Sequence, residues 1–126
     1  MVRHESEMPV SIGIHDLALA TSHHSLSLTD LADHYGIDPA KFSVGIGQDV
    51  MSVLAGDEDI VTMAADATAR IIARNGVEGI RTLLFATESG IDQSKSAGVY
   101  VHKLVGLPST VRVVALTPAC YSAPAA

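Results

Sequence analysis

Two short apolar blocks stand out in the C-terminal part of the chain, Thr82–Ala86 and residues 111–116. Continuous apolar runs of this length are typical of strands buried in a parallel sheet. Before each run, apolar residues recur at three- and four-residue intervals, over residues 60–75 and about 94–105, which predicts helices. The pattern therefore predicts helix, strand, helix and strand in succession.

The helix expected over Ile60–Asn75 has the clearest end signals. Asp57, Glu58 and Asp59 precede it, where negative charge complements the positive end of the helix dipole. Gly76 follows Asn75 and is expected to end the helix. This amphipathic helix is expected to pack on one face of the sheet.

The first half of the chain gives weaker signals. Residues 10–20 alternate imperfectly and predict a strand or hairpin arm, whereas residues 21–27 are polar and predict a loop. A short helix is expected from Thr29 or Asp30 to about Tyr35, with Gly36 as its C-terminal stop. Together the elements predict an α/β fold of parallel strands joined by right-handed crossovers.

The composition narrows the class of protein. With 126 residues, 48% of them hydrophobic, the chain can form one domain with an aliphatic core, which we assign to residues 10–126 after a disordered polar lead at 1–9. The net charge of −6, with eight Lys and Arg spread thinly, argues against a nucleic-acid partner. A single cysteine and no apolar run of membrane-spanning length indicate a cytoplasmic protein.

Each predicted strand is followed by one chemically capable side chain, Glu88 after the first and Cys120 after the second. Ligands of open α/β sheets bind beyond the carboxyl ends of the strands, so the two groups could meet at one edge. A helix starting at Tyr121 or Ser122 would favour the thiolate of Cys120 and offer amides to an oxyanion.

The residues alone leave other interpretations open. A lone cysteine is more often a small buried apolar residue, and Glu88 could be an ordinary solvated loop residue rather than a partly desolvated acid–base group. Gly45-Ile46-Gly47 lacks the setting of a dinucleotide site and indicates tight backbone passage. His23 and His24 have no partner at metal-ligand spacing, so no metal site is expected.

Four segments carry a resemblance to a known family. They are Phe-Ser-Val-Gly-Ile-Gly-Gln at 42–48, Asp-Ile-Val-Thr at 59–62, Thr-Glu-Ser-Gly-Ile-Asp-Gln-Ser-Lys-Ser at 87–96 and Ala-Cys-Tyr-Ser-Ala at 119–123. They resemble the N-terminal part of bacterial hydroxymethylglutaryl-CoA synthases. The resemblance implies the N-terminal half of a thiolase-like fold, incomplete on its own.

By this resemblance, Cys120 is the nucleophile that takes an acetyl group from acetyl-CoA. Glu88 is the general acid/base for the enolate that condenses with acetoacetyl-CoA, a step of the mevalonate route to isoprenoids. Asp38, Pro39, Ala40 and Lys41 match a segment beside CoA, where Lys41 could meet a phosphate. No cofactor is implied besides the CoA substrates.

The resemblance also implies partners. The family's catalytic histidine comes from much later in the polypeptide, so this chain is expected to be a fragment or a split subunit that needs a C-terminal half. The complete enzyme is expected to be a homodimer. Two alternatives stay open, a polyketide β-branching synthase acting on a carrier-protein-bound β-ketoacyl group, and a non-catalytic interaction subunit.

Overall fold

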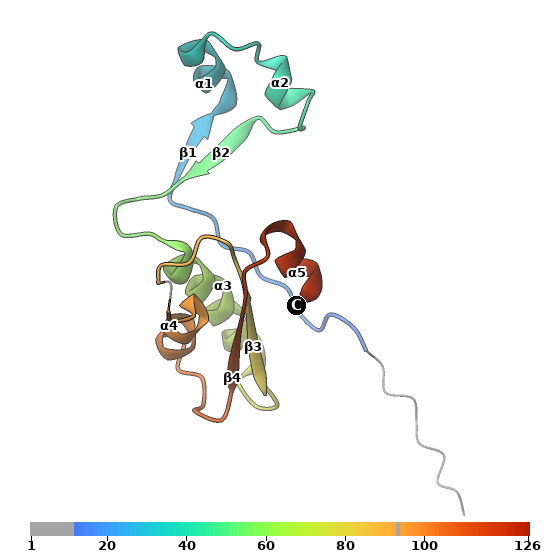
Figure 1. Cartoon of the computed structure of the whole chain (residues 1–126), viewed down its shortest axis with the longest axis vertical. Helices are drawn as coiled ribbons and strands as arrows, with labels where there is room; N and C mark the ends of the chain where they lie inside the picture. Colours follow the sequence, from blue (N-terminus) through green and yellow to red (C-terminus); the bar gives the residue numbers. More distant parts are fainter. Residues whose placement is uncertain (1–11, 93) are drawn as a thin grey trace, which may run out of the picture.

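The computed structural model describes residues 12–92 and 94–126, so the lead expected at 1–9 lies outside the described residues. The larger part of the structure is a two-stranded parallel sheet with helices on one face (Figure 1). Strand β3, Thr82–Ala86, pairs with β4, Arg112–Leu116. Helix α3, Ile60–Asn75, and helix α4, Ala97–Leu104, pack against each other, and α4 contacts both strands. The predicted succession of helix, strand, helix and strand is confirmed.

Alternation along the two strands separates a packed face from an open one. The core joins Phe85 of β3 to Val61 of α3 and to Ala97 and Val101 of α4. Burying a valine or phenylalanine side chain, such as Val61, Val101 or Phe85, contributes roughly 1.5–3 kcal/mol. On the opposite face, Leu84 and Val114 are directly paired and remain 42% and 41% exposed. Helices α3 and α4 therefore cover only one side of the sheet, on which Phe85 lies.

Helix α3 begins as its acidic start predicts. Asp59 is the N-cap, and its carboxylate accepts hydrogen bonds from the backbone N–H groups of Val61 and Thr62 at 2.9 and 2.7 Å. The Thr62 hydroxyl in turn bonds the backbone N–H of Asp59 at 2.9 Å, which completes a capping box. These hydrogen bonds lower the pKa of Asp59, as expected for a carboxylate at a helix N-terminus.

A separate small lobe contradicts part of the prediction. Strand β1, His24–Ser27, lies in the segment predicted as a loop and pairs antiparallel with β2, Val50–Val53. Helix α1, Leu28–Tyr35, follows β1, with Ser27 rather than Thr29 or Asp30 as its N-cap and Gly36 as its C-cap. A single helical turn, α2, Ala40–Ser43, completes the lobe. The prediction of parallel strands is therefore wrong for β1 and β2, which pair antiparallel.

The strand predicted at 10–20 is also wrong within its described residues. Residues 14–22 are neither helix nor strand, because their backbone pairs with no other described segment. Instead, Asp16 anchors this segment to the C-terminal end of α3. Its carboxylate accepts two hydrogen bonds from the Arg74 guanidinium, at 2.9 and 3.0 Å, and one from the Asn75 amide at 2.6 Å.

This anchor gives a pH-dependent prediction. The Arg74 hydrogen bonds hold the pKa of Asp16 at about 2, below its ordinary value of 3.8. Since the folded pKa is depressed, the carboxylate stabilises the fold above about pH 4, and this contribution is lost as the pH falls through about 2. A carbon-detected NMR titration of Asp16 should show that midpoint. The free energy of unfolding of Asp16→Asn should differ from that of the parent above about pH 4, and this difference should shrink as the pH falls towards about 2. A difference that stays constant over this range would contradict the role given to the Asp16 carboxylate.

Gly98 sets how closely α4 approaches the sheet. A Cβ at this position would lie 2.8 Å from Phe85 Cβ and 2.9 Å from Val113 Cγ1. Gly98→Ala should therefore destabilise the fold by about 1–3 kcal/mol through overpacking, less the gain in helix propensity of about 1 kcal/mol. Denaturant unfolding measures the loss. Gly56→Ala is the matched control, because nothing lies within 4 Å of its Cβ position, and an equal loss in both variants would refute the packing argument.

Candidate active site

The carboxyl ends of β3 and β4 bring the two predicted catalytic segments to one edge. The strands run in parallel with Ala86 opposite Leu116, and the Thr87 N–H donates to the Leu116 carbonyl at 3.0 Å. Glu88 follows two residues after Ala86, and Cys120 four residues after Leu116. The prediction that both groups leave the same end of neighbouring strands is confirmed.

Cys120 lies in a sharp turn. Ala119 has a φ of +43°, an uncommon conformation for a residue with a Cβ, and its N–H donates to the Thr117 carbonyl at 2.8 Å. A 3₁₀ turn, Ala119–Tyr121, then leads into the short helix α5, Ser122–Ala125. The thiol therefore sits at the start of helical structure and is exposed, not buried as a structural cysteine would be.

Glu88 differs from the prediction in one respect. Its side chain is exposed in the described chain, so the partial desolvation expected for this carboxylate is wrong here. The reason is geometric, because the loop after β3 runs out over the open end of a two-stranded sheet. Any desolvation of Glu88 must come from groups other than the described residues.

A cavity of about 340 Å³ lies between this loop and the end of β4. Its lining is mixed: Phe85, Ala97 and Ala115 are apolar, whereas the remaining side chains are hydroxyl-bearing or charged, namely Thr87, Asp92, Ser94, Lys95, Ser96 and Thr117. The cavity is thus lined by residues that lead directly to Glu88 on one side and to Cys120 on the other.

The far end of the Glu88 loop is tied to α4. The Asp92 carboxylate accepts hydrogen bonds from the N–H groups of Ser94 and Lys95 at 2.7 and 3.1 Å, and these bonds lower the pKa of Asp92. The Lys95 ammonium lies 4.3 Å from the centre of the Tyr100 ring, a cation–π contact. Ser96 then caps α4 by accepting from the Gly98 N–H at 3.2 Å.

The predicted CoA segment lies elsewhere. Asp38 accepts from the Ala40 N–H at 3.0 Å and so starts α2 beside Pro39, while Lys41 is exposed. This turn belongs to the β1–β2 lobe, apart from the ends of β3 and β4 (Figure 1). A Cβ at Gly45 would collide with the Lys41 carbonyl oxygen, which confirms tight backbone passage at this glycine. The structure therefore does not bring residues 38–41 to Cys120 and Glu88.

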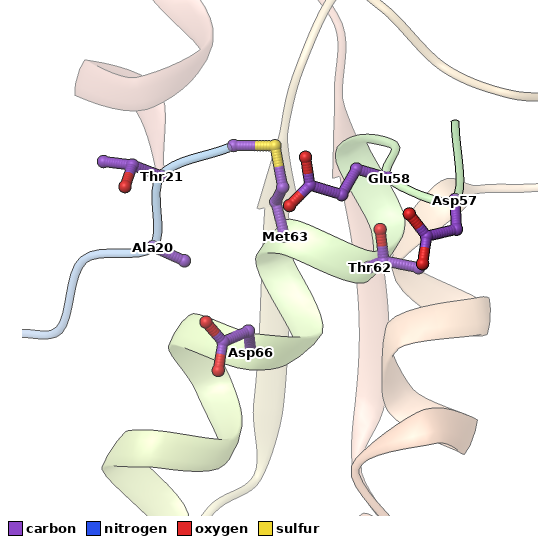
Figure 2. A pocket seen from close by; sticks show the side chains of 7 residues that line it. All are labelled: Ala20, Thr21, Asp57, Glu58, Thr62, Met63 and Asp66. Atoms are coloured by element: carbon purple, nitrogen blue, oxygen red, sulfur yellow. The ribbon is translucent and has the colours of Figure 1, made fainter. Parts of the chain in front are cut away.

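A second cavity, of about 220 Å³, lies where the N-terminal segment passes the start of α3. Met63 extends towards the segment carrying Ala20 and Thr21 (Figure 2). Asp57, Glu58 and Asp66 also line this cavity, and their charge opposes a phosphate-bearing ligand. No group of three metal-binding side chains gathers anywhere in residues 12–92 and 94–126, and no helix there is long and apolar enough to cross a membrane.

Two anchors of the Glu88 loop were missed in the sequence. Thr87 accepts a hydrogen bond from the Ser89 N–H at 3.1 Å through its hydroxyl, and Asp92 holds the other end. A sequence signal for both anchors exists, since a Thr or Asp in a turn commonly accepts a hydrogen bond from the backbone N–H two residues later. Thr87 with Ser89 and Asp92 with Ser94 have this spacing.

A parallel sheet that delivers a thiol in a sharp turn and a carboxylate from the neighbouring strand agrees with the thiolase-like fold expected from the sequence. Residues 8–126 match the family model described as hydroxymethylglutaryl-coenzyme A synthase N terminal. The chain belongs to this family.

Individual relatives agree with the family assignment. The hydroxymethylglutaryl-CoA synthase of Enterococcus faecalis is 39% identical over 116 residues, which cover 92% of this chain and 30% of the relative. The polyketide biosynthesis 3-hydroxy-3-methylglutaryl-ACP synthase of Bacillus subtilis is 31% identical, over 90% of this chain and 27% of the relative. The solved structure of MvaS in complex with 3-hydroxy-3-methylglutaryl coenzyme A superimposes with a TM-score of 0.86 at 39% identity, covering 94% of this chain and 29% of that one. The chain thus spans about 30% of the length of these relatives.

Proposed function

We propose that this chain supplies the nucleophile and the general acid/base of a hydroxymethylglutaryl-CoA synthase. The observation that carries the proposal is the parallel pairing of β3 with β4, which sends Glu88 and Cys120 out from one sheet edge. The family match and the relatives with this name support the same activity.

The reaction begins at Cys120. Its thiolate attacks the carbonyl carbon of acetyl-CoA, and the tetrahedral intermediate expels the CoA thiolate, which takes up a proton, leaving an acetyl thioester on the protein. The exposed position of the thiol suits attack on a large CoA thioester. Stabilisation of the oxyanion by backbone amides at the start of α5 is part of the proposal.

Glu88 acts in the second stage. Its carboxylate removes a proton from the acetyl methyl group, and the enolate carbon bonds to the ketone carbon of acetoacetyl-CoA, whose oxygen takes up a proton to become a hydroxyl. Water then adds to the Cys120 thioester and the C–S bond breaks. This step releases 3-hydroxy-3-methylglutaryl-CoA with a free carboxylate and regenerates the thiol.

The proposal includes a C-terminal half, on the same or a separate polypeptide. The chain spans about 30% of its relatives' length, and Leu84 and Val114 lie on an uncovered sheet face. A covering layer would bury that face and withdraw Glu88 from water. The placement of Lys41 beside a CoA phosphate and the homodimer belong to this proposal too, by resemblance. The cytoplasmic location belongs to it on the basis of the amino-acid composition.

The second candidate function differs in the acceptor substrate, the β-ketoacyl group that the enolate attacks. The Bacillus subtilis relative is named as an ACP synthase, so a carrier-protein-bound β-ketoacyl acceptor is the alternative. The higher identity to the Enterococcus faecalis enzyme favours free acetoacetyl-CoA. Comparing condensation rates with the two acceptors distinguishes them.

Acetyl-CoA labelling tests the function. The chain is incubated with isotopically labelled acetyl-CoA, with and without the C-terminal half, and the peptide carrying Cys120 is analysed by mass spectrometry. We expect an acetyl adduct on Cys120 and its disappearance when acetoacetyl-CoA is added. Absence of any adduct in the presence of the C-terminal half would favour the non-catalytic interaction subunit instead.

A further inference from the structure

Thr87 occupies the junction between the two catalytic segments. Its backbone N–H bonds the Leu116 carbonyl at 3.0 Å, one step beyond the last paired residues of β3 and β4. Its hydroxyl oxygen accepts from the Ser89 N–H at 3.1 Å. The residues on both sides of Glu88 are therefore held through Thr87, and Thr87 itself is held by the strand that leads to Cys120.

These two hydrogen bonds restrict Glu88 in different ways. The bond to Leu116 fixes where the loop leaves the sheet, while the bond from Ser89 closes a tight side-chain turn around Glu88. Glu88 is exposed and no hydrogen bond of its carboxylate is found in the described residues, so the hydrogen bonds of Thr87 act on the backbone from which the Glu88 side chain starts. The far anchor, Asp92, bonds Ser94 and Lys95 and lies four residues beyond Glu88.

Thr87 also lines the cavity between the loop and β4, as Thr117 does. Thr87 is half-buried, and its hydroxyl oxygen accepts from the Ser89 N–H. Valine has nearly the same shape but accepts no hydrogen bond, and serine keeps the acceptor. Replacing Thr87 by valine or by serine therefore tests the hydroxyl oxygen as a hydrogen-bond acceptor with little change in side-chain volume.

We propose that Thr87 is a positioning residue for the general acid/base: its hydroxyl, bonded to the Ser89 N–H, orients Glu88 towards the acetyl group on Cys120. The inference rests on the proposed function. Without the hydroxyl, the strand pairing and the Cys120 turn persist, but Glu88 samples a wider range of positions. Enolate formation then slows, while transfer of acetyl to Cys120 does not.

The test compares Thr87→Val and Thr87→Ser in the complete enzyme, in which this chain is joined to its C-terminal half. Acetylation of Cys120 and condensation with acetoacetyl-CoA are measured separately. In Thr87→Val, condensation should fall by about 10- to 100-fold, the loss expected for an acid–base group misplaced by about 1 Å. Acetylation should change less than about 2-fold, and Thr87→Ser should restore most of the condensation rate.

Controls separate this inference from the proposed function. Thr110→Val removes the hydroxyl of an exposed threonine before β4 and should leave both rates unchanged. Normal condensation in Thr87→Val, equal loss of both steps, or failure of serine to restore the rate would overturn the positioning role. Glu88→Gln in the same assay tests the function itself: if it still condenses, the assignment of Glu88 fails, whatever Thr87 does.

Discussion

Cys120→Ala should abolish acetyl transfer. Alanine offers no nucleophile, so no acetyl adduct forms on the peptide that carries residue 120, and overall synthesis should fall by a factor on the order of 10⁴ or more. Cys120→Ser should lose nearly as much activity, because a serine hydroxyl is not ionised near neutral pH and is a weaker nucleophile than a thiolate. Mass spectrometry after incubation with acetyl-CoA, together with steady-state assays of the complete enzyme, measures both effects.

The control for this substitution must leave the fold intact. Cys120 is exposed in its turn, so its truncation should change the unfolding midpoint little, whereas Gly98→Ala should lower it. Acetylation that persists in Cys120→Ala would place the nucleophile elsewhere. Since Cys120 is the only cysteine of the chain, a persistent thioester would have to lie on the C-terminal half.

The fold was predictable where local pattern and packing agree. Helix α3 has both a regular apolar face and the Asp59 cap, and β3 and β4 each carry four consecutive apolar residues, so these elements were identified. Strand β1 was not, because His24–Ser27 carries one apolar residue and is defined by its pairing with β2. The opposite error occurred at residues 14–20, which were predicted as a strand. Their alternation of apolar and polar residues suits a strand, but no described segment pairs with them.

The positions of the two site residues at the sheet edge were predictable, but the exposure of their side chains was not. The position of Glu88 and Cys120 after consecutive parallel strands placed them at one edge, as the register of Ala86 with Leu116 shows. The exposure of Glu88 depends on what covers the edge, which no local pattern encodes. Thr87 was overlooked because its side chain accepts one hydrogen bond, from the Ser89 N–H, and a threonine after a strand has no periodic signal.

Glu88→Gln should separate the two halves of the reaction. Glutamine keeps the size of the side chain but cannot take a proton from the acetyl methyl group, so condensation should fall by about 10² to 10⁴-fold, the usual contribution of a positioned general acid/base. Acetylation of Cys120 needs the thiolate and not this carboxylate, so the adduct should form normally and accumulate. Single-turnover mixing of the acetylated enzyme with acetoacetyl-CoA measures the second step directly.

Glu78→Gln is the matched control, because Glu78 is exposed in the turn before β3 and carries the same charge. It should leave both steps unchanged, which excludes a general effect of removing one negative charge from a chain of net charge −6. Exchange of the acetyl methyl protons with deuterated water adds a second readout, since proton removal precedes the new carbon–carbon bond. If Glu88→Gln lost acetylation together with condensation, the carboxylate would act on Cys120 itself and the division of roles proposed here would be wrong.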